Sequence, residues 1–171
     1  MTPQGNSTDE EATAYHEAGH AIMGAIRDWP PLSVTIIPHG GAAGKNEFPE
    51  DCRPEFKSHL GGSPEKRFYI ETRILIALAG TSAHDLRFPA RVRDAGDEQD
   101  EQRARTIIAE NAGWADSCRD SYFHQLQEAA CMLLQTNWLW VEAVARALIE
   151  SKTILRPKLL ELRPSCDYPR A

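Results

Sequence analysis

The chain lacks several features that mark common classes of protein. No apolar run reaches the roughly 18 residues that a membrane-spanning helix needs, and no block of basic residues occurs in a chain of net charge −6. A membrane span and a nucleic-acid partner are therefore not expected. The N-terminus is polar and acidic, which argues against a signal peptide and favours a cytoplasmic protein. No G-x-x-x-x-G-K-[ST] loop is present to hold nucleotide phosphates.

Cysteine is scarce and scattered, at positions 52, 118, 131 and 166. No C-x-x-C pair occurs, which argues against a cysteine zinc site. A disulfide framework is not expected in a reducing compartment. Cys131 lies in an apolar helical stretch and is predicted to belong to the core.

The most informative segment is His16-Glu17-Ala18-Gly19-His20, an H-E-x-x-H run. Four residues make about one helical turn, so both imidazoles lie on one face and can bind one metal ion. Glu17 projects near that ion and can take a proton from its bound water, as in zinc peptidases. The simplest alternative is an amphipathic helix whose two histidines bind nothing.

The surrounding pattern predicts a mainly α fold with a small β element after this helix. We expect a helix over 9–28, ended by Trp29-Pro30-Pro31. A strand over 33–38, a tight loop over 39–44 and an extended segment over 45–48 should follow. Residues 49–62 read as a polar loop and a candidate flap. Further helices are expected over 64–79, 98–111 and 117–135, then one capped by Asn137, and a last turn over 158–162. Residues 80–86 either extend the second helix or begin a turn. We expect one domain over 1–171, with a core at about 7–163.

A catalytic zinc normally takes three protein ligands, and the third must come from elsewhere in the chain. The spacing H-E-x-x-H-x-x-G-x-x-H is absent, because Met23 and Ile26 occupy the last two positions. Other possible donors are Glu71, His84, Asp85 and Asp100. Spacing alone does not choose among them.

Several segments resemble the peptidase domain of the FtsH-type zinc metalloproteases, in that family's order. The H-E-x-x-H helix is similar to its active-site helix, and VTIIPHGGAAG (34–44) to its strand and glycine turn. The segment ALAGTSAHDL (77–86) resembles its helix ending in Gly-Arg-Ala-Ala-Glu-Glu. The segment AGDEQDEQRA (95–104) resembles its Thr-Gly-Ala-x-x-Asp segment, which supplies the third zinc ligand. Residues 137–154 are similar to its closing helices.

On this register the resemblance implies that Asp100 is the third ligand, with Asp97 as the rival if the register slips. The sequence also departs from the family. Thr81 and His84 replace an Arg and a Glu, and His39 replaces an Arg. The family's membrane anchor and ATPase domain are not found in these 171 residues, which leaves a separate ATPase or a homo-oligomer as open partners.

The resulting hypothesis is a zinc-dependent endopeptidase, with Zn²⁺ held by His16, His20 and Asp100 and with Glu17 as general base. Its substrate would be an extended peptide or unfolded protein, bound beside Gly44, Lys45 and Asn46. Cleavage would not depend on ATP. The alternative is a non-catalytic binding or regulatory protein that keeps the fold, but a structural site has no need of Glu17.

Overall fold

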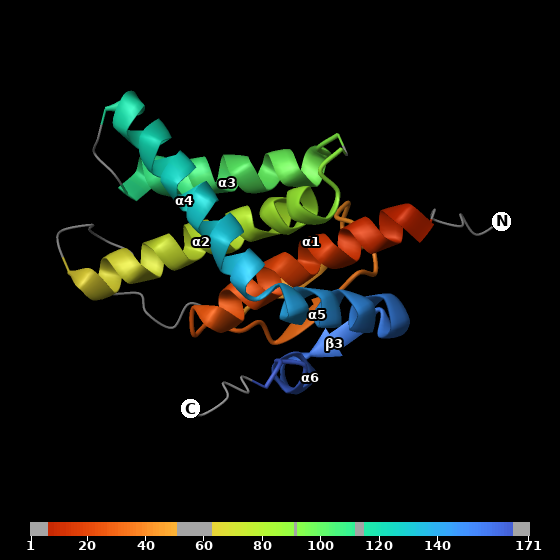
Figure 1. The fold of residues 1–171 in the computed structure, drawn as a ribbon. Helices are drawn as coiled ribbons and strands as arrows, with labels where there is room; N and C mark the ends of the chain where they lie inside the picture. The colour runs from red at the N-terminus through yellow and green to blue at the C-terminus, as the bar shows by residue number, and fades with distance from the viewer. Residues whose placement is uncertain (1–6, 51–62, 91, 112–114, 166–171) are drawn as a thin grey trace, which may run out of the picture.

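The computed structural model describes residues 7–50, 63–90, 92–111 and 115–165. Within these ranges helices dominate and three short strands form one sheet (Figure 1). The elements in chain order are α1 (Ser7–Ile26), β1 (Ser33–Thr35), β2 (Lys45–Glu47), α2 (Pro64–Arg87), α3 (Ala95–Asn111), α4 (Asp116–Thr136), α5 (Trp138–Ser151), β3 (Thr153–Leu155) and α6 (Arg156–Glu161). The expected fold class, mainly α with a small β element, is confirmed.

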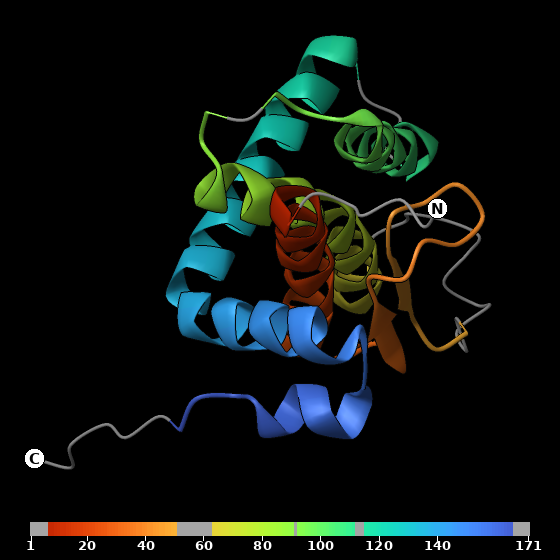
Figure 2. The ribbon, with the colours of Figure 1, turned by 90° about the vertical axis from the view of Figure 1, so that its right-hand side faces the viewer.

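Helix α1 is the central element of the fold, with α2 and α5 packed against it and the sheet beside it (Figure 2). Its small residues Ala14, Ala18 and Ala21 are completely buried. A Cβ added at Gly19 would lie 2.4 Å from the carbonyl oxygen of Ala79 on α2. The absence of a side chain at this position therefore lets α1 and α2 approach closely, and this approach brings the H-E-x-x-H run against α2.

Helix α2 begins as the sequence predicts. Ser63 is its N-cap and accepts a hydrogen bond from the Lys66 N–H at 3.3 Å, and Pro64 follows at the first helical position. The helix does not stop at Ala79 but continues to Arg87, which settles the open question about residues 80–86. The extra two turns carry the buried side chains of Thr81 and His84 toward α3.

The sheet has the order β2-β1-β3, and both pairs are antiparallel. Strand β1 is shorter than the expected 33–38, since regular pairing ends at Thr35. Strand β3 was not expected, because Thr153–Leu155 is too short to show a period of two. It follows Lys152, whose φ of 63° ends α5 and turns the chain back toward β1.

The C-terminal helices close the core from below α1 in Figure 1. Trp140 is buried, and its indole N–H donates to the Leu159 carbonyl at 2.9 Å, which ties α6 to α5. One expectation needs correction here, because Cys131 is only partly buried. Asn137 is the N-cap residue of α5 as expected, but its side chain makes no capping hydrogen bond and its amide donates back to the Leu133 carbonyl.

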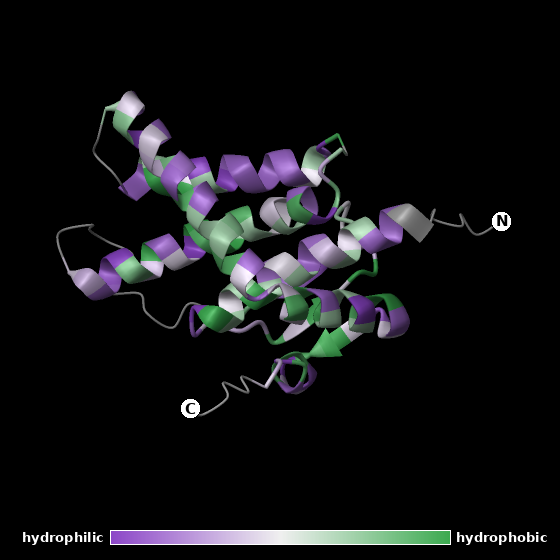
Figure 3. Ribbon diagram, viewed as in Figure 1, coloured by the Kyte–Doolittle hydropathy of each residue, from purple (hydrophilic) through white to green (hydrophobic). Residues whose placement is uncertain are grey.

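Hydropathy follows this packing (Figure 3). Helix α3 is largely polar and buries few side chains, among them Asp97, Ala104, Ile107 and Ile108. No helix in the described ranges is both long and apolar enough to cross a membrane. The proposed flap over 49–62 lies almost wholly outside the described residues.

The contact between α1 and α2 predicts a cost for any side chain at position 19. Gly19→Ala would push a methyl group against a backbone oxygen of α2, and we expect a loss of about 1–3 kcal/mol in the free energy of unfolding. Urea denaturation measures the effect. Gly96→Ala is the matched control, because its added Cβ would meet only the end of the Asp94 side chain, at 3.1 Å. Equal stability of the two variants would contradict this account of the packing.

Candidate metal centre and active site

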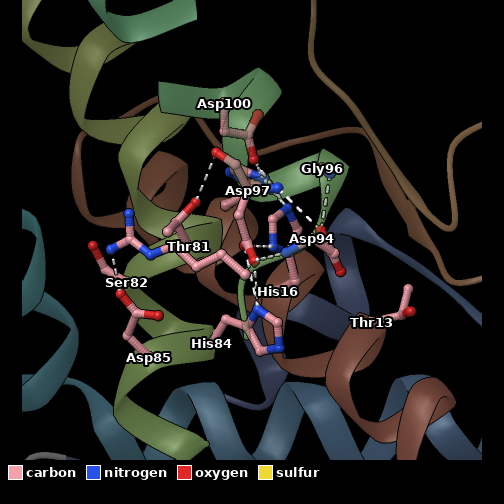
Figure 4. A network of polar contacts seen from close by, with 12 residues as sticks. Thr13, His16, Thr81, Ser82, His84, Asp85, Asp94, Gly96, Asp97 and Asp100 are labelled. Carbon is pink, nitrogen blue, oxygen red and sulfur yellow. Dashed lines mark hydrogen bonds and ion pairs between the residues drawn. The ribbon is translucent and has the colours of Figure 1, made fainter. Parts of the chain in front are cut away.

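Three side chains from two helices converge on one point. His16 and His20 lie one turn apart on α1, and Asp100 lies on α3. The two Nε2 atoms are 3.0 Å apart, and each is 3.0 Å from Asp100 Oδ2. Figure 4 shows Asp100 descending from α3 toward His16. These three atoms form a group that is compact enough to hold one metal ion.

The second ring nitrogen of each histidine also has a partner. His20 Nδ1 lies 2.7 Å from the Ile76 carbonyl of α2, which can only accept a hydrogen bond. His16 Nδ1 lies 3.3 Å from Asp97 Oδ1. In the metal-ready form both protons therefore sit on Nδ1, and both Nε2 atoms present lone pairs toward Asp100. The contact of the Ile76 carbonyl with His20 could not be predicted from the sequence, because every residue type has a backbone carbonyl.

The carboxylates of Asp100 and Asp97 place negative charge around the convergence point, and a positive group is needed there to balance it. Burial alone would lower the pKa of the His16 imidazole, but the neighbouring Asp100 and Asp97 carboxylates raise that pKa to about 10. Burial would raise the pKa of Asp100, but the His20 and His16 imidazoles hold it well below its usual range. The convergence point therefore favours positive charge, which a proton or a metal ion can supply.

The space around the convergence point is kept open by a missing side chain. A Cβ at Gly80 of α2 would lie 2.4 Å from His20 Nε2 and 2.7 Å from His16 Nε2. Any other residue at position 80 would collide with both imidazoles. Position 80 therefore requires glycine because of the space that the imidazoles occupy, and not because of its backbone conformation.

Glu17 is buried beside the convergence point and is held from the sheet. The Asn46 amide on β2 donates to Glu17 Oε2 at 2.7 Å and to the Glu17 carbonyl at 3.0 Å. A Cβ at Gly44 would lie 2.6 Å from the Glu17 side chain. Of the three residues expected to bind substrate, Gly44 and Asn46 therefore touch Glu17, whereas Lys45 is exposed.

The remaining candidates for the third donor lie elsewhere. Glu71 accepts hydrogen bonds from Arg67 and from Tyr122, at 2.8 and 2.7 Å. Asp85 is paired with Arg93 at 2.7 Å. Asp97 and His84 contact each other and reach His16 only from its Nδ1 side.

Known proteins resemble part of this chain. The model of peptidase family M41 matches residues 5–112. An ATP-dependent zinc metalloprotease FtsH from Pelobacter propionicus is 37% identical over 83 residues, which cover 47% of this chain and 12% of that protein. The corresponding protease from Acidobacterium capsulatum is 34% identical over 110 residues, or 60% and 16% of the two chains.

FtsH 3 of Synechocystis sp. is 33% identical over 97 residues, which cover 55% of this chain and 15% of that protein. The matched segment is thus a small part of each of these relatives. The family match includes α1, β1, β2, α2 and α3, the elements that carry the converging residues. By this match the chain belongs to peptidase family M41.

Proposed function

We propose that this chain is a zinc-dependent endopeptidase that cleaves extended or unfolded polypeptides. The observation that carries the proposal is the convergence of His16 Nε2, His20 Nε2 and Asp100 Oδ2 at mutual distances of 3.0 Å. The names of the relatives, which describe zinc metalloproteases, support the choice of metal. We further propose that residues 1–171 act as one peptidase domain, with its core at about 7–163.

The donor set fits zinc. Two imidazole nitrogens and one carboxylate oxygen form a three-ligand set that leaves a position for water, as catalytic zinc requires. Ligands about 2.0–2.1 Å from a tetrahedral metal lie about 3.3 Å from one another, close to the distances seen here. The Gly80 position leaves room for the ion where a Cβ would intrude.

When bound, zinc lowers the pKa of its water toward neutrality and polarises the scissile carbonyl. Glu17 is placed to take the proton from the attacking water and to pass it to the leaving amine. Asn46 holds one carboxylate oxygen of Glu17 by a hydrogen bond. This bond fixes the direction in which the Glu17 carboxylate points.

Substrate would bind along β2. Among the described residues this strand lies at one edge of the sheet, since its one partner there is β1, so its other edge can pair with an extended peptide backbone. Asn46 on this strand contacts Glu17, so a peptide added to β2 would run past the general base. Gly44 and Lys45 would line the same path. A folded substrate cannot present its backbone in this way.

The metal prediction concerns each donor separately. Purified chain should bind about one zinc, His20→Ala should abolish tight binding, and Asp100→Ala should weaken it, because each change removes one ligand. Glu71→Gln is the control, since it removes a carboxylate of α2 that contacts none of the converging atoms. Zinc content and affinity from a chelator competition provide the measurement. Weaker binding in Glu71→Gln than in Asp100→Ala would refute the ligand assignment.

The catalytic prediction concerns Glu17. Glu17→Gln keeps the shape of the side chain but cannot accept the proton, so peptide hydrolysis should fall by about 10²–10⁴-fold while zinc content stays unchanged. A fluorogenic peptide assay with parallel zinc analysis checks this. Equal rates in the wild type and the variant would rule out the general-base role and favour the non-catalytic alternative.

We expect the isolated chain to cleave unfolded substrates only, and to do so without ATP. The 171 residues contain no nucleotide-binding loop, so the isolated chain has no means to do work against several kcal/mol of substrate stability. It should cleave a permanently unfolded variant of a test protein, spare the folded form, and respond to ATP in neither case. Equal cleavage of the two forms, or stimulation by ATP in the absence of a partner, would overturn this proposal.

A further inference from the structure

Asp97 lies behind the convergence point, not in it. Its side chain is fully buried and faces His16 Nδ1, which is the nitrogen on the opposite side of the ring from Nε2. It also accepts a hydrogen bond from the Asp94 N–H at 3.1 Å. A buried carboxylate thus lies at the Nδ1 edge of His16 and is held there by contacts with His16, His84 and the Asp94 N–H.

His84 is the second partner of this carboxylate and comes from the turns of α2 beyond Ala79. Its Nδ1 lies 3.0 Å from Asp97 Oδ2, and its side chain is almost completely buried (Figure 4). Its ring stands edge-on to His16, at 6.3 Å between centroids, and to Phe88, at 5.7 Å. Phe88 in turn packs edge-on against Tyr15 of α1. The orientation of His84 is therefore fixed by an aromatic contact as well as by Asp97.

Together these contacts form one continuous connection from α2 through α3 to α1. The His84 Nδ1–H donates to Asp97, and Asp97 accepts the His16 Nδ1–H. In the metal-ready form this leaves His16 Nε2 with a lone pair that points toward Asp100. Without His84, Asp97 Oδ2 would keep its hydrogen bond from the Asp94 N–H and would lose its contact with α2. The carboxylate would then be freer to turn about its side-chain torsions and lose its alignment with His16.

We propose that Asp97 and His84 form a positioning pair that fixes the tautomer and ring orientation of His16, and that neither residue binds the metal. The proposal rests on the proposed function, because it takes His16 as a zinc ligand. It differs from a register slip in which Asp97 replaces Asp100, since here both carboxylates act, one on each side of the same imidazole. The alternative arrangement is a second metal ion held by His16, His84 and Asp97, whose ligand atoms also lie close together.

Substitutions at the pair should therefore weaken zinc binding without removing a ligand. Asp97→Asn replaces the charged acceptor by a neutral amide, and we expect an affinity about 10–100-fold lower, as found when outer partners of metal-binding histidines are lost. His84→Phe keeps a ring against Phe88 but removes the donor, and should weaken zinc binding in the same direction. His84→Asn loses the ring but keeps a donor near the Nδ1 position, and should recover much of the affinity. Glu98→Gln is the matched control, because it removes an exposed carboxylate from the same turn of α3.

The experiment measures zinc affinity by chelator competition, and the ligand field from the visible spectrum of the Co²⁺-substituted chain, with circular dichroism to check the fold. The proposal requires weaker binding and altered Co²⁺ bands for Asp97→Asn and His84→Phe, relative to Glu98→Gln, with recovery in His84→Asn. If Asp97→Asn does not fold, the two His84 variants still decide the question. Affinities and bands equal to those of Glu98→Gln, or two zinc ions bound per wild-type chain, would overturn it.

These readouts separate the positioning pair from the proposed activity. A wild-type chain that binds zinc, shows the expected ranking of variants and cleaves no peptide would overturn the peptidase proposal and leave the positioning pair standing. Peptide cleavage that depends on Glu17, with zinc affinity unchanged in Asp97→Asn and His84→Phe, would support the peptidase proposal and overturn the positioning pair. A wild-type chain that binds no zinc would overturn both.

Discussion

The rest of this structure depends on one constraint: three atoms with lone pairs are held close together and point at one another. His16 Nε2, His20 Nε2 and Asp100 Oδ2 lie 3.0 Å apart, and without a positive charge between them they repel. The fold holds the two imidazoles there because the second nitrogen of each ring has a partner. The Ile76 carbonyl orients His20, Asp97 faces His16, and Gly80 leaves the centre open. A buried arrangement of this kind is stable when a cation or proton occupies the centre.

Helix α2 contributes more to this arrangement than its lack of converging donors suggests. Its Ile76 carbonyl orients one imidazole, its Gly80 leaves space beside both imidazoles, and its His84 holds the carboxylate behind the other imidazole. The first two depend on the close contact between α1 and α2 at Gly19 and Ala79, because they join α2 to the histidines of α1. Helix α2 therefore acts as the support against which the residues of α1 and α3 are aligned.

The sequence predicted the parts of this structure that follow from local pattern. The H-E-x-x-H spacing placed His16 and His20 on one helical face, and Ser63-Pro64 marked the start of α2. The contribution of α3 was reached only through a family resemblance, because spacing along the chain says nothing about which distant acid meets two histidines. Asp97 and Asp100 were treated as rivals, whereas the structure places one on each side of His16. Strand β3 and the Ile76 carbonyl were missed, since a three-residue strand and a backbone oxygen leave no readable signal.

The coordination sphere of the zinc-loaded chain, determined by crystallography, tests the central claim most directly. The account predicts one zinc bound by His16 Nε2, His20 Nε2 and one Asp100 oxygen at about 2.0–2.2 Å, with a fourth position open to water. Asp97 should face His16 Nδ1 and lie outside the sphere. A fourth protein ligand, or Asp97 in place of Asp100, would contradict it.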